Sequence, residues 1–398
     1  MSKTNLTRRL SIALGSSAIL LAAFGQTPAF AETKDPIKIG YLTPVTGRLE
    51  SYGKSHQQVF NMGIAEVNKA GGVNGHPIQL VTEDTGFSPP QAIEKLRKLS
   101  EQDKVFAVVG PYGTNEVDPS APLANRLKIP LISSTFTKPG IPAVNRPWVF
   151  RFGPNDQQLI DWTVKAHRTM FPKVKKIVLI GNAGEAYIAA TLKQTLPAAF
   201  KANGFELVDT VEVTTGQVDY SAAVTRLARA NAEMIFVNVI AGELLGVAQE
   251  MAKQKAADGK IVVGVQGLWA GPWLIVSKGA MENWYSSGYF DYGTTNPKAK
   301  AFLERALPER EKLGLRQAIT VEASSYDLAF VLAKIMTEAK ITPKTPVEEA
   351  RLKIQQGMAA LKDYDGMTGK LSVDKDGETV GFVFSVFQGK GNRWVRAN

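Results

Sequence analysis

The feature that most restricts the fold of this chain is a repeated alternation of apolar strand patterns with amphipathic helix patterns. Residues 105–109 are a continuous apolar run, and the strand patterns at 37–42 and 176–180 are mainly apolar. Each of the three is followed by a stretch with apolar residues at helical spacing. Continuously apolar strands are typical of parallel sheets covered on both faces, and parallel strands need crossover connections that are usually helices. The alternation therefore predicts an α/β protein built from doubly wound parallel sheets.

The alternation falls into two blocks, about 40–150 and 156–290, each with the size of one doubly wound lobe. Residues 296–360 show three helical patterns and no good strand. This stretch cannot form a third α/β domain, and we expect it to pack back onto one of the lobes. Near the C-terminus, residues 370–387 alternate like a β-hairpin around the turn residues 374–377.

The first thirty residues have the pattern of a cleavable secretory signal. The basic pair Arg8-Arg9 precedes an apolar stretch at 10–24, and an Ala-x-Ala cleavage pattern follows at 29–31. The apolar run is shorter than the roughly 20 residues that a membrane-spanning helix needs. We expect export by the general route, cleavage after Ala31 and a periplasmic location.

Composition excludes several chemistries and several partners. The chain has no cysteine, which excludes disulfides, iron–sulfur clusters, thiolate zinc sites and a cysteine nucleophile. Its formal net charge of +10 invites a nucleic-acid interpretation, but loss of the signal leaves about +7. The remaining basic residues are spread, whereas a nucleic-acid binder should show a basic stripe with interleaved aromatic residues. We therefore expect no nucleic-acid partner.

Catalytic motifs are not apparent in the sequence. The chain has no phosphate-binding loop, no nucleophile elbow and no zinc-binding His-Glu-x-x-His motif. His56, His76 and His167 fall on a helix, a turn and a helix, and we interpret them as surface or capping residues. The pair Glu83-Asp84 at a strand end is interpreted as a polar contact or helix cap rather than an acid/base pair. We expect no enzyme activity, no metal and no cofactor.

Hydroxyl and backbone groups gather where two predicted strands end. Residues 110–115 follow the strand 105–109 and lead into a helix, and residues 134–137 follow the strand 130–133. In open α/β sheets the ligand crevice lies outside the carboxyl ends of the strands. Helix-start N–H groups and threonine hydroxyls at such an edge make a neutral cradle for a carboxylate. From the residues alone, a ligand site and ordinary turns with helix caps are equal alternatives.

Several motifs, in order along the chain, resemble periplasmic binding proteins of the leucine/isoleucine/valine type. They are IGYLTP at 39–44, NKAGGVNG at 68–75, IPLISS at 129–134 and GMTGKL at 366–371. The resemblance covers nearly the whole mature chain. It implies a type I periplasmic binding fold, in which two doubly wound parallel-sheet lobes are joined by three crossover strands. The lobes close on a small ligand, which stabilises the closed state because it contacts both.

The resemblance also implies the organisation of the protein and its partners. A signal peptide (1–31) would be followed by one lobe of 36–154 plus 291–368 and another of 155–290 plus 369–398. Family members deliver their ligand to a membrane permease driven by separately encoded ATPases. We therefore expect a monomeric solute-binding subunit of an ABC importer that captures a small carboxylate. A ligand-sensing partner of a membrane receptor and an exported enzyme are the alternatives.

Ligand-binding residues are carried over by their position in the resemblance. Thr114 matches a serine that binds the ligand carboxylate. Thr135, through its backbone, and Thr137 match the positions that hold the amino-acid head group. Tyr112 and Gly113 match positions that touch the ligand side chain.

The remaining positions concern the walls of the cleft. Tyr52 and Tyr187 match aromatic residues that line it from the two lobes, and Phe136 lies between head-group positions, with core packing as its alternative role. Gln266 stands where amino-acid binders carry an acid for the ligand ammonium, and a buried ammonium without a carboxylate is costly. Trp269, close to Gln266, would suit a flat aromatic acid. The ligand class stays open between an amino acid and a related organic or aromatic acid.

Overall fold

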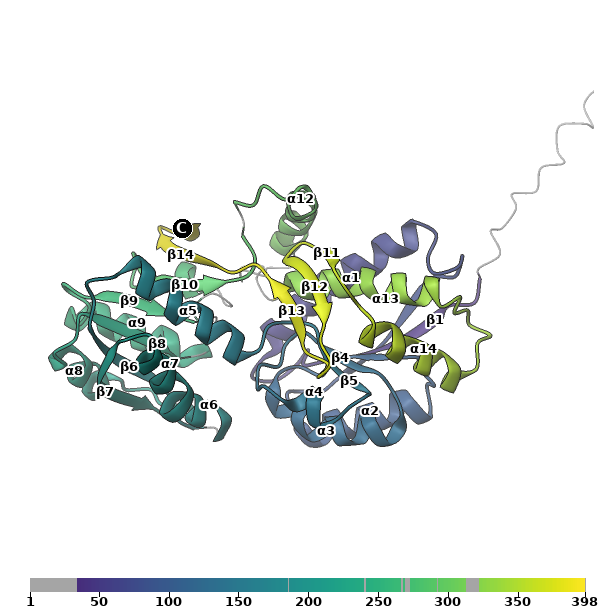
Figure 1. The fold of residues 1–398 in the computed structure, drawn as a ribbon, viewed down its shortest axis with the longest axis horizontal. Helices are drawn as coiled ribbons and strands as arrows, with labels where there is room; N and C mark the ends of the chain where they lie inside the picture. The colour runs from purple at the N-terminus through teal and green to yellow at the C-terminus, as the bar shows by residue number, and fades with distance from the viewer. Residues whose placement is uncertain are drawn as a thin grey trace, which may run out of the picture. The chain divides into compact units, whose positions relative to one another are not determined.

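Two sheets of mainly parallel strands and one small antiparallel sheet carry the architecture of the described chain (Figure 1). The computed structural model describes residues 34–397 with the exception of Glu185, Ile240, 266–267, 269–272, Tyr292 and 313–321. The predicted signal peptide therefore lies outside the described residues.

The first sheet is parallel throughout, with the strand order β2-β1-β3-β4-β5. Its strands are β1 (Ile37–Thr43), β2 (Ile78–Asp84), β3 (Val108–Val109), β4 (Leu131–Ser133) and β5 (Val149–Arg151). The helices between them are α1 (Glu50–Lys69), α2 (Pro89–Glu101), α3 (Thr114–Leu127) and α4 (Ile141–Val144). The alternation predicted for the first block is confirmed.

Helices cover both faces of the first sheet. Ile39 of β1 and Phe60 of α1 belong to the core cluster on one face. Leu42 of β1, Leu96 of α2 and Val117 of α3 belong to the cluster on the other face. Because neighbouring side chains of a strand point to opposite faces, a strand such as β1, with buried apolar residues on both faces, serves both clusters.

Three later helices complete the covering of this sheet. They are α12 (Pro297–Lys312), α13 (Glu322–Glu338) and α14 (Val347–Ala359). Helix α13 packs against α1, and its residues Leu328 and Val331 enter the same core cluster as Phe60 (Figure 1). The expectation that residues 296–360 pack back onto an α/β block is therefore confirmed.

The second sheet has the strand order β15-β14-β10-β9-β8-β6-β7. Five strands are mutually parallel: β6 (Lys176–Asn182), β7 (Glu206–Val213), β8 (Met234–Asn238), β9 (Ile261–Gly264) and β10 (Tyr285–Gly288). Two antiparallel strands extend its edge, β14 (Ser385–Lys390) and β15 (Arg393–Arg396). Its described helices are α5 (Asp156–Met170), α6 (Ala186–Ala190), α7 (Leu196–Ala202), α8 (Ser221–Arg229), α9 (Ala241–Gln254) and α11 (Trp273–Val276).

The stretch 185–202 has apolar residues at helical spacing, which predicts one helix. From Ala186 onward the structure shows an interrupted helix. A π-helical turn at Thr191–Thr195 separates α6 from α7. Pro197 lies two residues beyond this turn and has no N–H group for the helical ladder. Such π turns are rare and occur mostly as single turns inside α-helices.

The predicted C-terminal hairpin is confirmed in its first half. A third sheet of antiparallel strands contains β11 (Tyr364–Gly366), β12 (Gly369–Val373) and β13 (Thr379–Phe382). The alternation after the turn of this hairpin predicts a single second strand over 379–387, and this prediction is wrong in extent. Only its first part pairs with β12, and from Ser385 it pairs with Gly288 in the second sheet.

Three segments connect the second sheet with the rest of the described chain, which comprises the first sheet, its helices and the third sheet, as the predicted fold class requires. They are 152–155, 289–296 and 383–384. The lobe boundaries given above stay a prediction. Among the described residues, no helix is long and apolar enough to cross a membrane.

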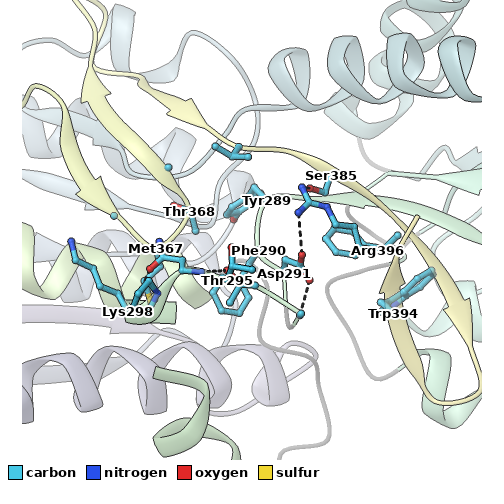
Figure 2. Close-up of a pocket in the computed structure, with 18 of the residues that line it drawn as sticks. Tyr289, Phe290, Asp291, Thr295, Lys298, Met367, Thr368, Ser385, Trp394 and Arg396 are labelled. Carbon is cyan, nitrogen blue, oxygen red and sulfur yellow. Dashed lines mark hydrogen bonds and ion pairs between the residues drawn. The ribbon is translucent and has the colours of Figure 1, made fainter. Parts of the chain in front are cut away.

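A groove of about 1040 Å³ follows two of these connections (Figure 2). Within it, the Arg396 guanidinium pairs with Asp291 at 3.5 Å and donates to Ser385 Oγ at 2.7 Å. These contacts attach the C-terminal strand β15 to the segment after β10. The residues predicted to bind ligand that the structure describes lie outside this groove.

Candidate functional site

The two stretches predicted to share a sheet edge do so. Strands β3 and β4 are parallel neighbours, with Val109 opposite Ile132. Beyond their carboxyl ends, Ser133 Oγ donates to the Pro111 carbonyl at 2.9 Å, and the Gly113 N–H donates to Thr135 Oγ1 at 3.0 Å. These bonds hold residues 110–115 and 133–138 side by side, and we call the two segments together the cradle.

Thr114 connects the two halves of the cradle. It is the first residue of α3, and its hydroxyl oxygen accepts the backbone N–H groups of Thr137 at 3.2 Å and Lys138 at 3.3 Å. A hydroxyl offers two acceptor lone pairs and one donor hydrogen. Because both acceptor positions are used, the remaining capacity of the Thr114 hydroxyl is to donate. This group is therefore prepared to meet an acceptor such as a carboxylate oxygen.

Gly113 gives the chain the turn into α3. Its φ of 74° lies in the left-handed region that glycine tolerates. A Cβ atom at this position would lie 3.3 Å from the Phe87 ring. The glycine thus brings Thr114 to the helix start next to an aromatic side chain.

Glu116 is a buried carboxyl group under the cradle that the sequence analysis missed. It is 0% exposed, and its Oε2 accepts the Tyr112 backbone N–H at 3.2 Å. Burial raises the pKa of Glu116 to about 7, and hydrogen bonds from the Tyr112 amide and other donors oppose this only in part. The side chain is therefore largely protonated at mildly acidic pH.

The Glu116→Gln variant is expected to change how stability depends on pH. Because the folded pKa is raised, the stabilisation from the protonated form is complete below pH 4.5 and is lost as pH rises through about 7. Glutamine is neutral throughout, so the variant should gain roughly 2–3 kcal/mol relative to the wild type between pH 5 and pH 8. Urea unfolding at both pH values measures this, and parallel pH profiles of the two proteins would contradict it.

Aromatic rings form a wall beside the cradle. The ring of Tyr112 lies 6.4 Å from Tyr52, 6.5 Å from Phe87 and 5.3 Å from the imidazole of His56, measured between centroids. Burial raises the pKa of Tyr112 and of Tyr52, so both phenols stay protonated. The indole of Trp273 lies beside the Tyr52 hydroxyl. We call Tyr52, His56, Phe87 and Tyr112 the aromatic wall.

The interpretation of two histidines as surface or capping residues is wrong. His56 is 2% exposed and His167 is 1% exposed. Helix α1 is covered by the sheet on one side and by α13 on another, so His56 Nδ1 lies 3.0 Å from Ser325 Oγ of α13. His167 Nδ1 lies 2.8 Å from the Thr163 carbonyl of its own helix, and burial lowers its pKa to about 4.

Tyr187 is brought to the cradle through an acid that the sequence analysis missed. Its hydroxyl donates to Asp156 Oδ2 at 2.6 Å and lies 3.4 Å from the Thr137 carbonyl. The Asp156 backbone N–H donates to the same carbonyl at 2.9 Å. Burial raises the pKa of Asp156 above its usual value. In the sequence, Asp156 is marked only by its position at the start of the helix that follows the first connecting segment.

Three further residues of the predicted site are buried in the core or lie outside the described chain. Phe136 is 1% exposed and belongs to the core cluster around Leu131, and the Arg151 guanidinium lies 3.9 Å above its ring centroid. Its burial supports the alternative role of core packing. Gln266 and Trp269 lie outside the described residues.

Asp84 has the structural role that the sequence analysis favoured. Its carboxylate accepts the N–H groups of Val45 and Gly86, each at 2.9 Å, and the Thr46 hydroxyl at 2.6 Å. Burial acts to raise its pKa, but these hydrogen bonds lower it overall. No group of three or more acidic or histidine side chains among the described residues is arranged to hold a metal ion.

A family model described as periplasmic binding protein matches residues 36–392. This chain belongs to that family. The match includes the first sheet, the second sheet up to its edge strand β15, the cradle and all three connecting segments. The resemblance of the short sequence motifs therefore extends to nearly the whole described fold.

Individual relatives agree with the family. A leucine-, isoleucine-, valine-, threonine- and alanine-binding protein of Pseudomonas aeruginosa is 26% identical over 96% of this chain and 96% of its own length. The alignments with four curated relatives cover 57% to 96% of those proteins.

Solved structures show the same fold. LivJ of Streptococcus pneumoniae, a branched-chain amino acid transporter substrate-binding protein in complex with isoleucine, has a TM-score of 0.76 at 24% identity and covers 90% of this chain and 98% of its own. An ABC transporter solute-binding protein of Rhodopseudomonas palustris in complex with p-hydroxybenzoic acid has a TM-score of 0.77 at 20% identity, covering 91% and 95%. The predicted type I fold class is confirmed.

Proposed function

We propose that this periplasmic binding protein is the solute-binding subunit of an ABC importer of the branched-chain amino acid type and captures a small carboxylate at the cradle. The proposal of a carboxylate ligand rests on the hydroxyl group of Thr114. Two backbone amides fill the acceptor positions of this hydroxyl, so its hydrogen is left to donate to the ligand. No basic side chain is needed, because oriented hydroxyl and N–H groups at a helix start stabilise an anion.

The aromatic wall favours an aromatic acid as the ligand. A flat ring gains from offset or edge contacts with Tyr52, Tyr112 and Phe87, beyond the apolar area that it buries. The Rhodopseudomonas palustris structure with p-hydroxybenzoic acid gives a precedent for such a ligand on this fold. A branched-chain amino acid is the second candidate. It is favoured by the names of the relatives and by the Asp156 carboxyl beside Thr137, which could receive an ammonium.

The partners and the location follow from the same proposal. The family implies an extracytoplasmic protein, and the segment 1–31 would direct export and be cleaved after Ala31. The ligand-loaded protein would act as a monomer that docks on a membrane permease, whose ATPases are separate chains. It would carry no catalytic activity of its own.

A panel of ligands tests the proposal by thermal shift of the mature protein. Benzoate, 4-hydroxybenzoate, leucine, isoleucine and valine are each compared with the corresponding amide. A ligand present at 100 times its Kd should add about 2.7 kcal/mol and raise Tm by several degrees, and its amide should not.

The pattern of shifts separates the two ligand candidates. A shift with the benzoates alone supports the aromatic acid, and a shift with the amino acids alone supports the second candidate. If none of the acids raises Tm, or if the amides act as strongly as the acids, the carboxylate site is wrong.

A further inference from the structure

Arg151, the last residue of β5, directs its guanidinium at the cradle. The side chain is 0% exposed. Its Nη1 donates to the Phe136 carbonyl and its Nη2 to the Lys138 carbonyl. These carbonyls stand on either side of Thr137, so one guanidinium holds the backbone before and after a predicted ligand residue.

Glu378 holds this guanidinium from the other side. Arg151 Nε donates to Glu378 Oε2 at 2.5 Å, and Nη2 lies 3.3 Å from Oε1. The carboxylate also accepts the Gly140 N–H at 3.2 Å and the Asn155 side-chain amide at 3.3 Å. Glu378 belongs to the turn between β12 and β13, where its own N–H donates to Asp374 at 3.0 Å. The C-terminal hairpin therefore supports the cradle through a single buried ion pair.

We propose that Arg151, fixed by Glu378, is a positioning residue that presets Thr137 for the ligand; this rests on the proposed function. In a trans peptide the C=O and N–H groups point in opposite directions. Because Arg151 draws the Phe136 carbonyl away from the cradle, the Thr137 N–H faces Thr114, as observed. The Thr137 carbonyl is held in turn by Asp156. If the cradle is already ordered before the ligand arrives, binding does not include the entropic cost of ordering the cradle.

Stability alone does not explain this ion pair. Replacing a buried ion pair by apolar side chains of similar volume is often neutral or stabilising, because desolvation offsets much of the attraction. A nonpolar pair at these positions could fill the space but could not hold two backbone carbonyls. The guanidinium supplies a planar set of donors with fixed directions, which is what the two carbonyls use.

The double variant Arg151→Met/Glu378→Met tests the inference. It removes both charges together, so neither is left buried alone, and methionine keeps most of the volume. We expect a folded protein whose Kd for the acid that binds the wild type best is raised at least tenfold. Glu378→Gln keeps an acceptor for Nε and should give a smaller increase, about threefold, which is rescue by a conservative change.

Arg351→Met is the matched control. Arg351 is also a buried arginine whose guanidinium donates to backbone carbonyls, those of Ser100 at the end of α2 and of Val105. Val105 lies before β3, at the end of the strand opposite to the cradle. This variant loses a comparable set of bonds, and its Kd should stay within twofold of the wild type.

Amide hydrogen exchange in the ligand-free protein separates positioning from general weakening. In the double variant, exchange at Thr137 should be at least tenfold faster, while exchange at Val211 in the second sheet stays unchanged. Unchanged exchange at Thr137, or a folded double variant with wild-type Kd, overturns the inference while the proposed function stands. If no acid binds the wild type, the proposed function fails, and exchange at Thr137 still decides the role of Arg151.

Discussion

The double variant Thr114→Ala/Thr137→Ala is expected to lose binding of the carboxylate ligand, with an affinity at least about a hundredfold lower. A hydrogen bond to a charged group contributes about 1.5–3 kcal/mol, so two such bonds account for this loss. The change also removes the oxygen that accepts the amides of Thr137 and Lys138. Isothermal titration with the best acid from the panel measures the effect.

The fold should survive this substitution. Both threonines are only partly buried, and water can replace the lost hydroxyl partners, so we expect a loss of about 1 kcal/mol in unfolding free energy. The matched control is Thr169→Ala/Thr225→Ala, which removes two hydrogen-bonded threonine hydroxyls from α5 and α8. Control binding should equal that of the wild type. Wild-type affinity in the Thr114/Thr137 variant would place the head-group site elsewhere.

The sequence was sufficient for the sheets and for the place of the cradle. A continuously apolar run such as 105–109 has to be buried on both sides, and this requires helices on both faces of a parallel sheet. The carboxyl ends of neighbouring parallel strands meet at one edge, so residues 110–115 and 133–138 had to come together. The sheets and the place of the cradle follow from local periodicity and from sheet topology. Contacts of single side chains change neither of them.

The supporting contacts of the site could not be predicted in this way. Arg151 and Glu378 are separated by 227 positions, and each one alone is an ordinary charged residue in the sequence. Their pairing depends on where the β12–β13 turn lies against β5. The burial of His56 could not be predicted for the same reason, because it depends on packing against α13, which begins 266 positions later. Long-range packing, rather than local pattern, sets these contacts.

Two local features were misjudged because tertiary pairing overrides local alternation. The pattern at 379–387 suits one long strand, yet the chain leaves β13 after Phe382 and enters the second sheet at Ser385. The stretch 185–202 has apolar residues at helical spacing throughout, and this spacing does not distinguish the π turn at Thr191–Thr195 from an α-helix. Periodicity reports which face is buried, and it does not report which sheet a strand joins.

The substitution Gly110→Ala is expected to produce the largest loss of stability, about 2–5 kcal/mol. Gly110 follows β3 and has a φ of 101°, where an L residue pays about 1–2 kcal/mol. Its added Cβ would lie 2.1 Å from the Leu42 carbonyl oxygen of the adjacent strand β1. Relief of this overlap requires the backbone to move, which costs typically 1–3 kcal/mol in a well-packed region. Urea unfolding should show a lower midpoint with an unchanged slope.

Gly204→Ala isolates the steric part of this loss. Gly204 has a φ of 72°, and no atom lies within 4 Å of the position that its Cβ would take. It therefore pays the conformational cost alone, about 1–2 kcal/mol. Equal losses in the two variants would show that β1 and β3 separate easily at this edge. A much larger loss at Gly110 would show that the strand ends are rigid there. Such rigidity matters because the cradle begins at this residue, so any shift that admits a Cβ also moves Tyr112 and Thr114.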